Sequence, residues 1–173
     1  LRSRGLGDVY KRQAEDNIVG GKPITLLNVE MDVIRKAAVA QLKDGETVWF
    51  GNDVLEQMDR KDGLLDSKLY QNDALFDVDL SMSKAERLQY GQAAVSHAMT
   101  ITGVDVVDDD VTKWKVENSW GEKNGDKGYF AMTDDWFENY VYQVVVHRKY
   151  LTADQLKIAD SKPEPLPVWD PMM

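Results

Sequence analysis

The chain has 173 residues, of which 43% are hydrophobic and 29% charged, and its formal net charge at pH 7 is −9. This length and composition are typical of one soluble globular domain, and the acidic balance argues against nucleic-acid binding, which needs clustered lysine and arginine. No apolar run approaches the roughly 20 residues that span a bilayer, and no secretory signal pattern appears at the start. We therefore predict a cytoplasmic location, with no membrane partner and no nucleic-acid partner.

The sequence contains no cysteine. This excludes a disulfide framework, a thiolate metal site and a thiol nucleophile within these residues. The acidic run at residues 105–110 (DVVDDD) is rich in oxygen ligands, but it lacks the spaced ligands, central glycine and closing glutamate of an EF-hand loop. We therefore interpret this run as a hairpin turn, and we expect no metal ion or other cofactor.

Residues 1–13 (LRSRGLGDVYKRQ) differ in character from the rest of the chain. They hold four of its 21 lysine and arginine residues and show neither helical nor strand periodicity. We interpret them as a non-native remnant of cloning or sequence assembly and leave them out of the predicted fold. A native disordered arm is the alternative.

Residues 29–43 carry the pattern of an amphipathic helix. Their apolar side chains recur at helical spacing, with Asn28 as the expected N-cap and Gly45 beyond the far end. Residues 46–50 (ETVWF) are typical of a strand, and residues 51–79 are predicted to form loops with one short helix.

A second short helix is predicted over residues 84–89. Ser83 is its expected N-cap, and Glu86 stands three residues later, which is the signature of a capping box.

Four later segments have β-like sequences and predict a barrel-like antiparallel sheet together with Val48: residues 95–104, 113–118, 129–132 and 140–147. The last of these is almost continuously hydrophobic, which predicts burial on both of its faces. A helical turn is predicted just before it, at residues 134–139. Together with the predicted helices, these strands give an α+β fold.

Two of these strands carry the residues that are best suited to chemistry. His97 lies in the first and Asn118 in the second, so a turn between the strands places ring and amide side by side. The Asn118 carbonyl oxygen can accept a ring N–H and fix the tautomer, which leaves the other ring nitrogen free to move protons. We predict a ring nitrogen of His97 within about 3 Å of the Asn118 amide. The other histidine, His147, has no such neighbours and is interpreted as incidental.

The residues around Asn118 resemble those of the papain-like cysteine peptidases, in which a histidine precedes an Asn-Ser-Trp-Gly box and a Gly-Tyr-Phe strand. Here the box is residues 118–121 and the strand is residues 128–130. The resemblance is stronger to the bleomycin hydrolase and aminopeptidase C branch of that family, and it covers residues 17–172. Its motifs are LKDGETVWFGND (42–53), SHAMTITGV (96–104), WKVENSWGEK (114–123), DDWFENYVYQVVV (134–146) and PLPVWDPM (165–172).

This resemblance implies the right-hand, β-barrel-like domain of the papain-like fold over residues 14–160, with packing helices. It also implies that His97 is the general base and acid, that Asn118 orients it, and that the Trp120 indole shields their hydrogen bond from water. Because a cysteine is missing, the chain looks like the C-terminal part of an intracellular cysteine aminopeptidase that acts on peptides, and it is expected to be inactive alone.

The missing nucleophile leaves two interpretations. If the catalytic cysteine lies in an N-terminal half outside these residues, an exposed apolar patch should mark the face where that half docks. The alternative is a cysteine-less peptide-binding or assembly module of the same fold.

Residues 161–173 contain four prolines and predict an extended C-terminal arm, since proline is excluded from helix interiors and central strands. In the resembling family the enzyme is a homohexameric barrel whose active sites face an inner chamber, and the chain terminus anchors the free amino group of the substrate. If the arm is complete, the Met173 carboxylate has this role. Family members continue for a few residues, so we expect the sequence to be clipped at both ends.

Overall fold

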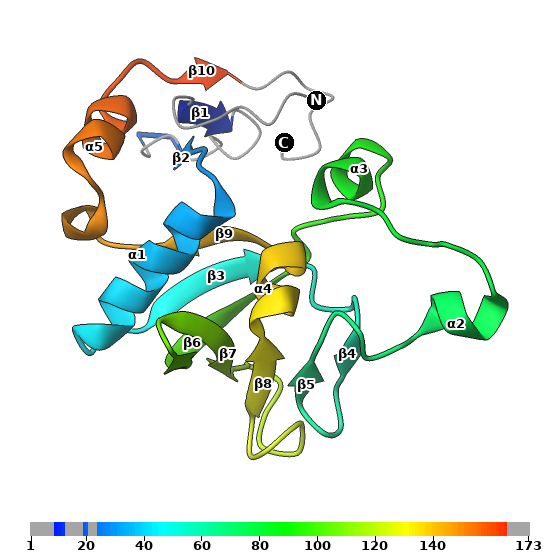
Figure 1. The fold of residues 1–173 in the computed structure, drawn as a ribbon. Helices are drawn as coiled ribbons and strands as arrows, with labels where there is room; N and C mark the ends of the chain where they lie inside the picture. Colours follow the sequence, from blue (N-terminus) through cyan, green and yellow to red (C-terminus); the bar gives the residue numbers. More distant parts are fainter. Residues whose placement is uncertain (1–8, 13–18, 21–23, 166–173) are drawn as a thin grey trace. The chain divides into compact units, whose positions relative to one another are not determined.

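A computed structural model describes residues 9–12, 19–20 and 24–165 of the chain. The chain divides into two compact units, one of residues 38–146 and the other of residues 1–37 with residues 147–173. The larger unit contains a seven-stranded sheet and the smaller unit a three-stranded sheet (Figure 1). Strands and helices occur together in both units, and the predicted α+β fold is confirmed.

The seven-stranded sheet has the strand order β4-β5-β8-β7-β6-β3-β9. Neighbouring strands are antiparallel except for β5 and β8, which are parallel. The short strands β4 and β5 lie within the stretch that was predicted to be loops. In chain order the strands are β3 (Val48–Asn52), β4 (Met58–Asp59), β5 (Leu64–Leu65), β6 (His97–Val107), β7 (Asp110–Glu117), β8 (Tyr129–Thr133) and β9 (Val141–Val145).

The predicted hairpin turn lies between β6 and β7. These strands are longer than predicted, so only Asp108 and Asp109 remain in the loop. Both residues have positive φ, at 51° and 70°, which is what a two-residue type I′ turn requires. The acidic run is therefore a tight turn that sets the register of the two strands.

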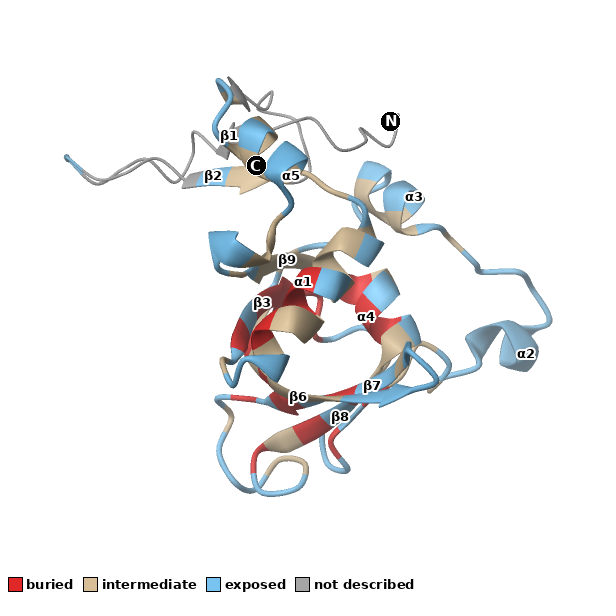
Figure 2. Cartoon of the chain, turned by 60° about the vertical axis from the view of Figure 1, so that its left-hand side comes forward, coloured by how far each residue is buried: buried red, intermediate tan, exposed pale blue. Residues whose placement is uncertain are grey.

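The hydrophobic core lies on one face of the larger sheet, because alternate side chains of each strand point the same way. Helix α4 (Asp134–Tyr140) packs against β7, β8 and β9 and buries Trp136 and Phe137. The Thr133 hydroxyl caps this helix by accepting the Trp136 N–H at 3.2 Å. Figure 2 shows buried residues on β3, β6, β8 and α4. The strand residues of the core are Val48, Phe50, Met99, Ile101, Trp114, Val116, Phe130 and Met132.

Helix α3 (Lys84–Gln89) has the predicted bounds and the predicted capping box. The Ser83 hydroxyl accepts the Glu86 N–H, and the Glu86 carboxylate accepts the Ser83 N–H at 2.8 Å. Helix α1 (Met31–Lys43) begins two residues later than predicted, so Asn28 lies before its N-cap position. None of the helices in the described part of the chain is long and apolar enough to cross a membrane.

An exposed apolar segment begins in α2 (Asn72–Phe76), the short helix within residues 51–79. Four large apolar side chains within residues 75–80 are half or more exposed: Leu75, Phe76, Val78 and Leu80. Apolar side chains exposed at this density are expected on a docking face.

One strand prediction is wrong. The hydrophobic run at residues 140–147 was expected to be buried on both faces, but Val145 of β9 is 58% exposed. The reason is its place in the fold, because β9 is the last strand at one edge of the seven-stranded sheet. The run is also split between two elements, since Tyr140 ends α4 and β9 begins at Val141.

The smaller unit contains a sheet with the strand order β10-β1-β2. Strand β1 (Val9–Arg12) is antiparallel to β2 (Ile24–Leu27) and parallel to β10 (Glu164–Pro165). Strand β1 falls within residues 1–13, which were left out of the predicted fold, so that omission is wrong for residues 9–12. The non-native origin of residues 1–13 stays a prediction. The remainder of that stretch lies outside the described residues, as do residues 166–173 of the predicted arm, including Met173.

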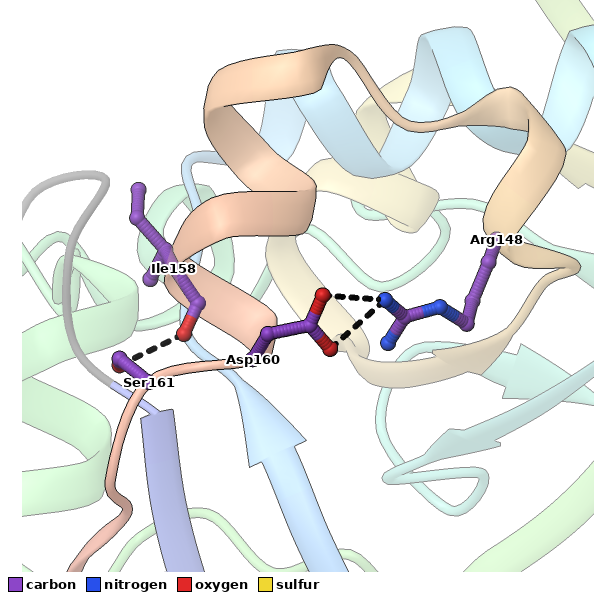
Figure 3. Close-up of polar contacts among 4 residues, drawn as sticks. All are labelled: Arg148, Ile158, Asp160 and Ser161. Carbon is purple, nitrogen blue, oxygen red and sulfur yellow. Dashed lines mark hydrogen bonds and ion pairs between the residues drawn. The ribbon is translucent and has the colours of Figure 1, made fainter.

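An ion pair joins the two ends of the helical segment in the smaller unit. This segment consists of the 3-10 turn η1 (Arg148–Tyr150) and helix α5 (Ala153–Ala159). An Nη2 atom of Arg148 lies 2.8 and 2.9 Å from the two carboxylate oxygens of Asp160 (Figure 3). Both side chains are largely exposed, so the pair contributes at most about 1 kcal/mol.

Asn52, at the end of β3, is wholly buried, and neither atom of its amide has a hydrogen-bond partner among the described residues. A buried polar group without a partner costs about 1–3 kcal/mol. Replacing Asn52 with leucine, which has a similar volume, is therefore expected to raise the free energy of unfolding by about 1 kcal/mol in urea titrations.

The matched control is Gln41→Leu. Gln41 is also buried, but its Nε2 donates to the Thr47 carbonyl oxygen at 2.8 Å, so this change should lower the free energy of unfolding. A loss of stability in Asn52→Leu as well would mean that the Asn52 amide is hydrogen-bonded in solution.

Candidate active site

Strands β6 and β7 bring His97 and Asn118 to the same face of the sheet. His97 is the first residue of β6, and Asn118 directly follows β7. Ile101 is paired with Val116, and both are buried in the core. Because side chains alternate along a strand, His97 shares the face of Ile101, and Asn118 shares the face of Val116.

The predicted contact between these side chains is present. The His97 Nε2 atom lies 2.9 Å from the Asn118 Oδ1 atom. The same Oδ1 accepts the Ser119 backbone N–H at 2.8 Å. A backbone N–H is always a donor, so the atom that faces it must be the amide oxygen. His97 therefore carries its proton on Nε2 in the neutral state, and Nδ1 keeps the lone pair of a base.

Trp120 packs against the His97 ring, as predicted. The two ring centroids are 4.9 Å apart at an interplanar angle of 31°. Phe130 contacts the indole edge-on, with a centroid distance of 6.1 Å and an angle of 80°. Asn118 is 8% exposed and His97 is half-buried. Reduced access of water strengthens the hydrogen bond between them, because the local dielectric is lower.

A buried carboxylate holds the segment that leads into His97. Asp53 follows β3 and is 7% exposed. Its two oxygens accept the Ala94 N–H and the Ser96 hydroxyl, each at 3.1 Å. The Ser96 N–H also donates to the Asn52 carbonyl oxygen at 3.0 Å. These bonds hold the backbone that sets the His97 position, and sequence reasoning missed Asp53. A carboxylate directly after an apolar strand was the only available signal.

Glu56 adds a second carboxyl group near Asp53. Glu56 is an exposed residue, but partial desolvation of its carboxyl raises the pKa of that group, the negative charge of Asp53 raises it further, and Arg87 opposes both effects. A carboxyl whose pKa is higher in the folded state than in the unfolded state favours folding most at acidic pH. That contribution is lost as pH rises from the unfolded-state pKa through the folded-state pKa.

Of the other predicted residues, His147 belongs to the smaller unit and directly precedes η1, and Met173 lies outside the described residues. Among the described residues, no group of three or more His, Cys, Asp or Glu side chains is arranged to hold a metal ion. The arrangement of His97, Asn118 and Trp120 is suited to proton transfer at Nδ1 beside a shielded hydrogen bond.

Known proteins are similar to this chain in sequence and in fold. Residues 2–173 match the peptidase C1-like family. Aminopeptidase G of Lactobacillus delbrueckii subsp. lactis is 60% identical over 95% of this chain and 38% of its own length. Aminopeptidase E of Lactobacillus helveticus is 58% identical over 94% of this chain and 37% of its own length.

A solved structure agrees with these relatives. The crystal structure of PepW from Lactobacillus rhamnosis has a TM-score of 0.92 and 49% identity, and the match covers 95% of this chain and 38% of that one. The chain thus spans well under half the length of the relatives it matches. The resemblance predicted from the motifs is confirmed, and the chain belongs to the peptidase C1-like family.

Proposed function

We propose that this chain supplies the histidine and asparagine of a Cys-His-Asn site in a cysteine-type aminopeptidase related to bleomycin hydrolase. The observation that carries the proposal is the 2.9 Å contact between His97 Nε2 and Asn118 Oδ1 beneath Trp120. The relatives at 58–60% identity are named aminopeptidases, which supports a peptide substrate with a free amino terminus. The sequence has no cysteine, so the thiol would come from polypeptide outside these 173 residues.

The geometry suits each proton transfer of thiol peptidase chemistry. His97 Nδ1 would take the proton of the thiol, and the thiolate would attack the carbonyl carbon of the first peptide bond. The Nδ1–H would then protonate the leaving amine, which leaves a thioester with the N-terminal residue. A water molecule that gives its proton to Nδ1 would attack the thioester, release the residue and restore the thiol. Asn118 would hold the ring in one orientation and tautomer throughout.

The same proposal includes the assembly and location that the resemblance implies. The whole protein would be a cytoplasmic homohexamer with its sites facing an inner chamber. An extended arm would bring its terminal carboxylate to the substrate ammonium, and an opposite charge in a partly desolvated groove fixes the amino end. The Met173 carboxylate would fill this role if the arm ends there.

A second function, a cysteine-less peptide-binding or assembly module, is favoured by one observation, which is the absence of cysteine from the sequence. The two functions predict opposite results for the protein expressed together with the coding sequence upstream of this chain. Hydrolysis of aminoacyl anilides and of their N-acetylated counterparts would be followed before and after treatment with iodoacetamide.

We expect hydrolysis of the free-amino substrates alone, its loss after alkylation, and no hydrolysis by the 173-residue chain. Turnover that survives alkylation would contradict a thiol mechanism. Peptide binding without hydrolysis, in a protein whose upstream sequence encodes no cysteine, would establish the binding module instead.

A further inference from the structure

We propose that Arg60 is a positioning residue that holds Trp120 over the His97–Asn118 hydrogen bond. Arg60 is exposed and follows β4, far from Trp120 in the chain. Its guanidinium carbon nevertheless lies 4.6 Å from the centroid of the Trp120 ring. The same indole contacts His97 at a centroid distance of 4.9 Å. The indole therefore links an exposed cation to the proposed general base.

Arg60 also holds the backbone of Trp120, through Asn124. The Arg60 Nε–H donates to Asn124 Oδ1 at 2.6 Å, and Asn124 Nδ2 donates to the Trp120 carbonyl oxygen at 2.6 Å. The next residue, Gly125, donates its N–H to the Arg60 carbonyl oxygen at 3.1 Å. One arginine thus contacts the Trp120 ring directly and restrains the Trp120 main chain through a single amide.

The turn that carries Arg60 is itself fixed. An Asp59 carboxylate oxygen accepts the N–H groups of Lys61 and Asp62 at 2.9 and 3.0 Å. At its far end Gly63 lies so close to Gly125 that a Cβ atom on Gly63 would come within 2.7 Å of the Gly125 Cα. The turn fixes the backbone of Arg60, and the hydrogen bond from its Nε–H to Asn124 holds the guanidinium over the indole.

The chemistry of this contact favours arginine over lysine. A guanidinium is planar, stacks on an indole and still presents its Nε–H in the plane, whereas a lysine ammonium is a point charge on a flexible stem. If the indole moves, water gains access to the His97 Nε2–H and competes for Asn118 Oδ1. Arg60 thereby acts on the proton-transfer site through Trp120, without contact to the reacting atoms.

The structural part of this proposal is tested on the chain itself, by NMR exchange of the His97 ring N–H with water. The chain has two histidines, so the His97 signal is identified by comparison with a His147 variant. We expect Arg60→Met to accelerate this exchange at least about tenfold and Arg60→Lys to have an intermediate effect. Asn124→Asp, which keeps the acceptor for Arg60 but loses the donor to Trp120, should also accelerate it.

Lys115→Met is the matched control. Lys115 is exposed on β7 and lies 4.3 Å from the centroid of the Tyr129 ring, so its removal deletes a cation–π contact in the same sheet without touching Trp120. Exchange at His97 should be unchanged in this variant. Unchanged exchange in Arg60→Met, with the fold retained, would overturn the proposal. Equal acceleration in Lys115→Met would overturn it as well, because the effect would then be a general loss of stability.

The kinetic part rests on the proposed function and is measured in the whole protein. Arg60→Met should lower kcat about tenfold and change KM less than twofold, because the variant loses orientation of the base and not substrate contacts. A fall in kcat that Arg60→Lys partly restores supports the positioning role. Faster ring exchange with unchanged kcat would overturn the kinetic role of Arg60. A whole protein without any thiol-dependent turnover would contradict the proposed function and leave the exchange result standing.

Discussion

Replacing Trp136 with alanine is expected to lower the free energy of unfolding of the chain by about 3–5 kcal/mol. Trp136 is a residue of α4 and is wholly buried on the side of this helix that packs against the sheet. Its indole N–H donates to the Glu56 carbonyl oxygen at 2.9 Å, and its ring lies 5.3 Å from that of Tyr140. Alanine would leave a cavity in a closely packed core and a carbonyl oxygen without its donor.

Urea unfolding followed by circular dichroism measures this loss, and Trp49→Ala is the matched control. Trp49 is on β3 but is 44% exposed, so its removal should cost much less. Trp136→Phe keeps most of the apolar surface and should cost about 1–3 kcal/mol, chiefly from the unpaired carbonyl. Equal losses for Trp49→Ala and Trp136→Ala would contradict the packing described for α4.

Local signals in the sequence predicted the parts of the fold that depend on local interactions. The helix at residues 84–89 has its predicted bounds because Ser83 and Glu86 satisfy each other's backbone N–H groups within one turn. His97 and Asn118 were predicted to meet because strand alternation and a hairpin are enough to place two side chains on one face. Each of these predictions depends on only a few nearby residues and on the regular repeat of a helix or a strand.

Features of the fold that depend on partners far along the chain were either missed or wrongly predicted. Strand β5 has two residues and pairs with β8, which lies far along the chain, so no periodic pattern marks it. Strand β9 was wrongly expected to be buried on both faces, since hydrophobicity does not tell an edge strand from a central one. The contact of Arg60 with Trp120 also escaped, because residues 58–63 (MDRKDG) predict only a turn.

The whole protein with His97→Ala is expected to lose at least about 10⁴-fold in kcat, with little change in KM. In the proposed mechanism the imidazole both takes the thiol proton and protonates the leaving amine, so its removal should disable both steps together. The fold should be retained, because the ring is only half-buried and Asn118 Oδ1 still accepts the Ser119 N–H once the imidazole is gone. Steady-state kinetics on an aminoacyl anilide measures the loss.

Two variants make this result specific to the proposed roles. His147→Ala removes the second histidine of these 173 residues, which lies in the smaller unit, and should keep near-normal turnover. Asn118→Ala leaves the base but frees its ring to rotate and to change tautomer, so its kcat should lie between those of the wild type and His97→Ala. Near-normal kcat in His97→Ala would show that His97 is not the base. A loss in His147→Ala as large as that in His97→Ala would show that the effect is not particular to the His97–Asn118 pair.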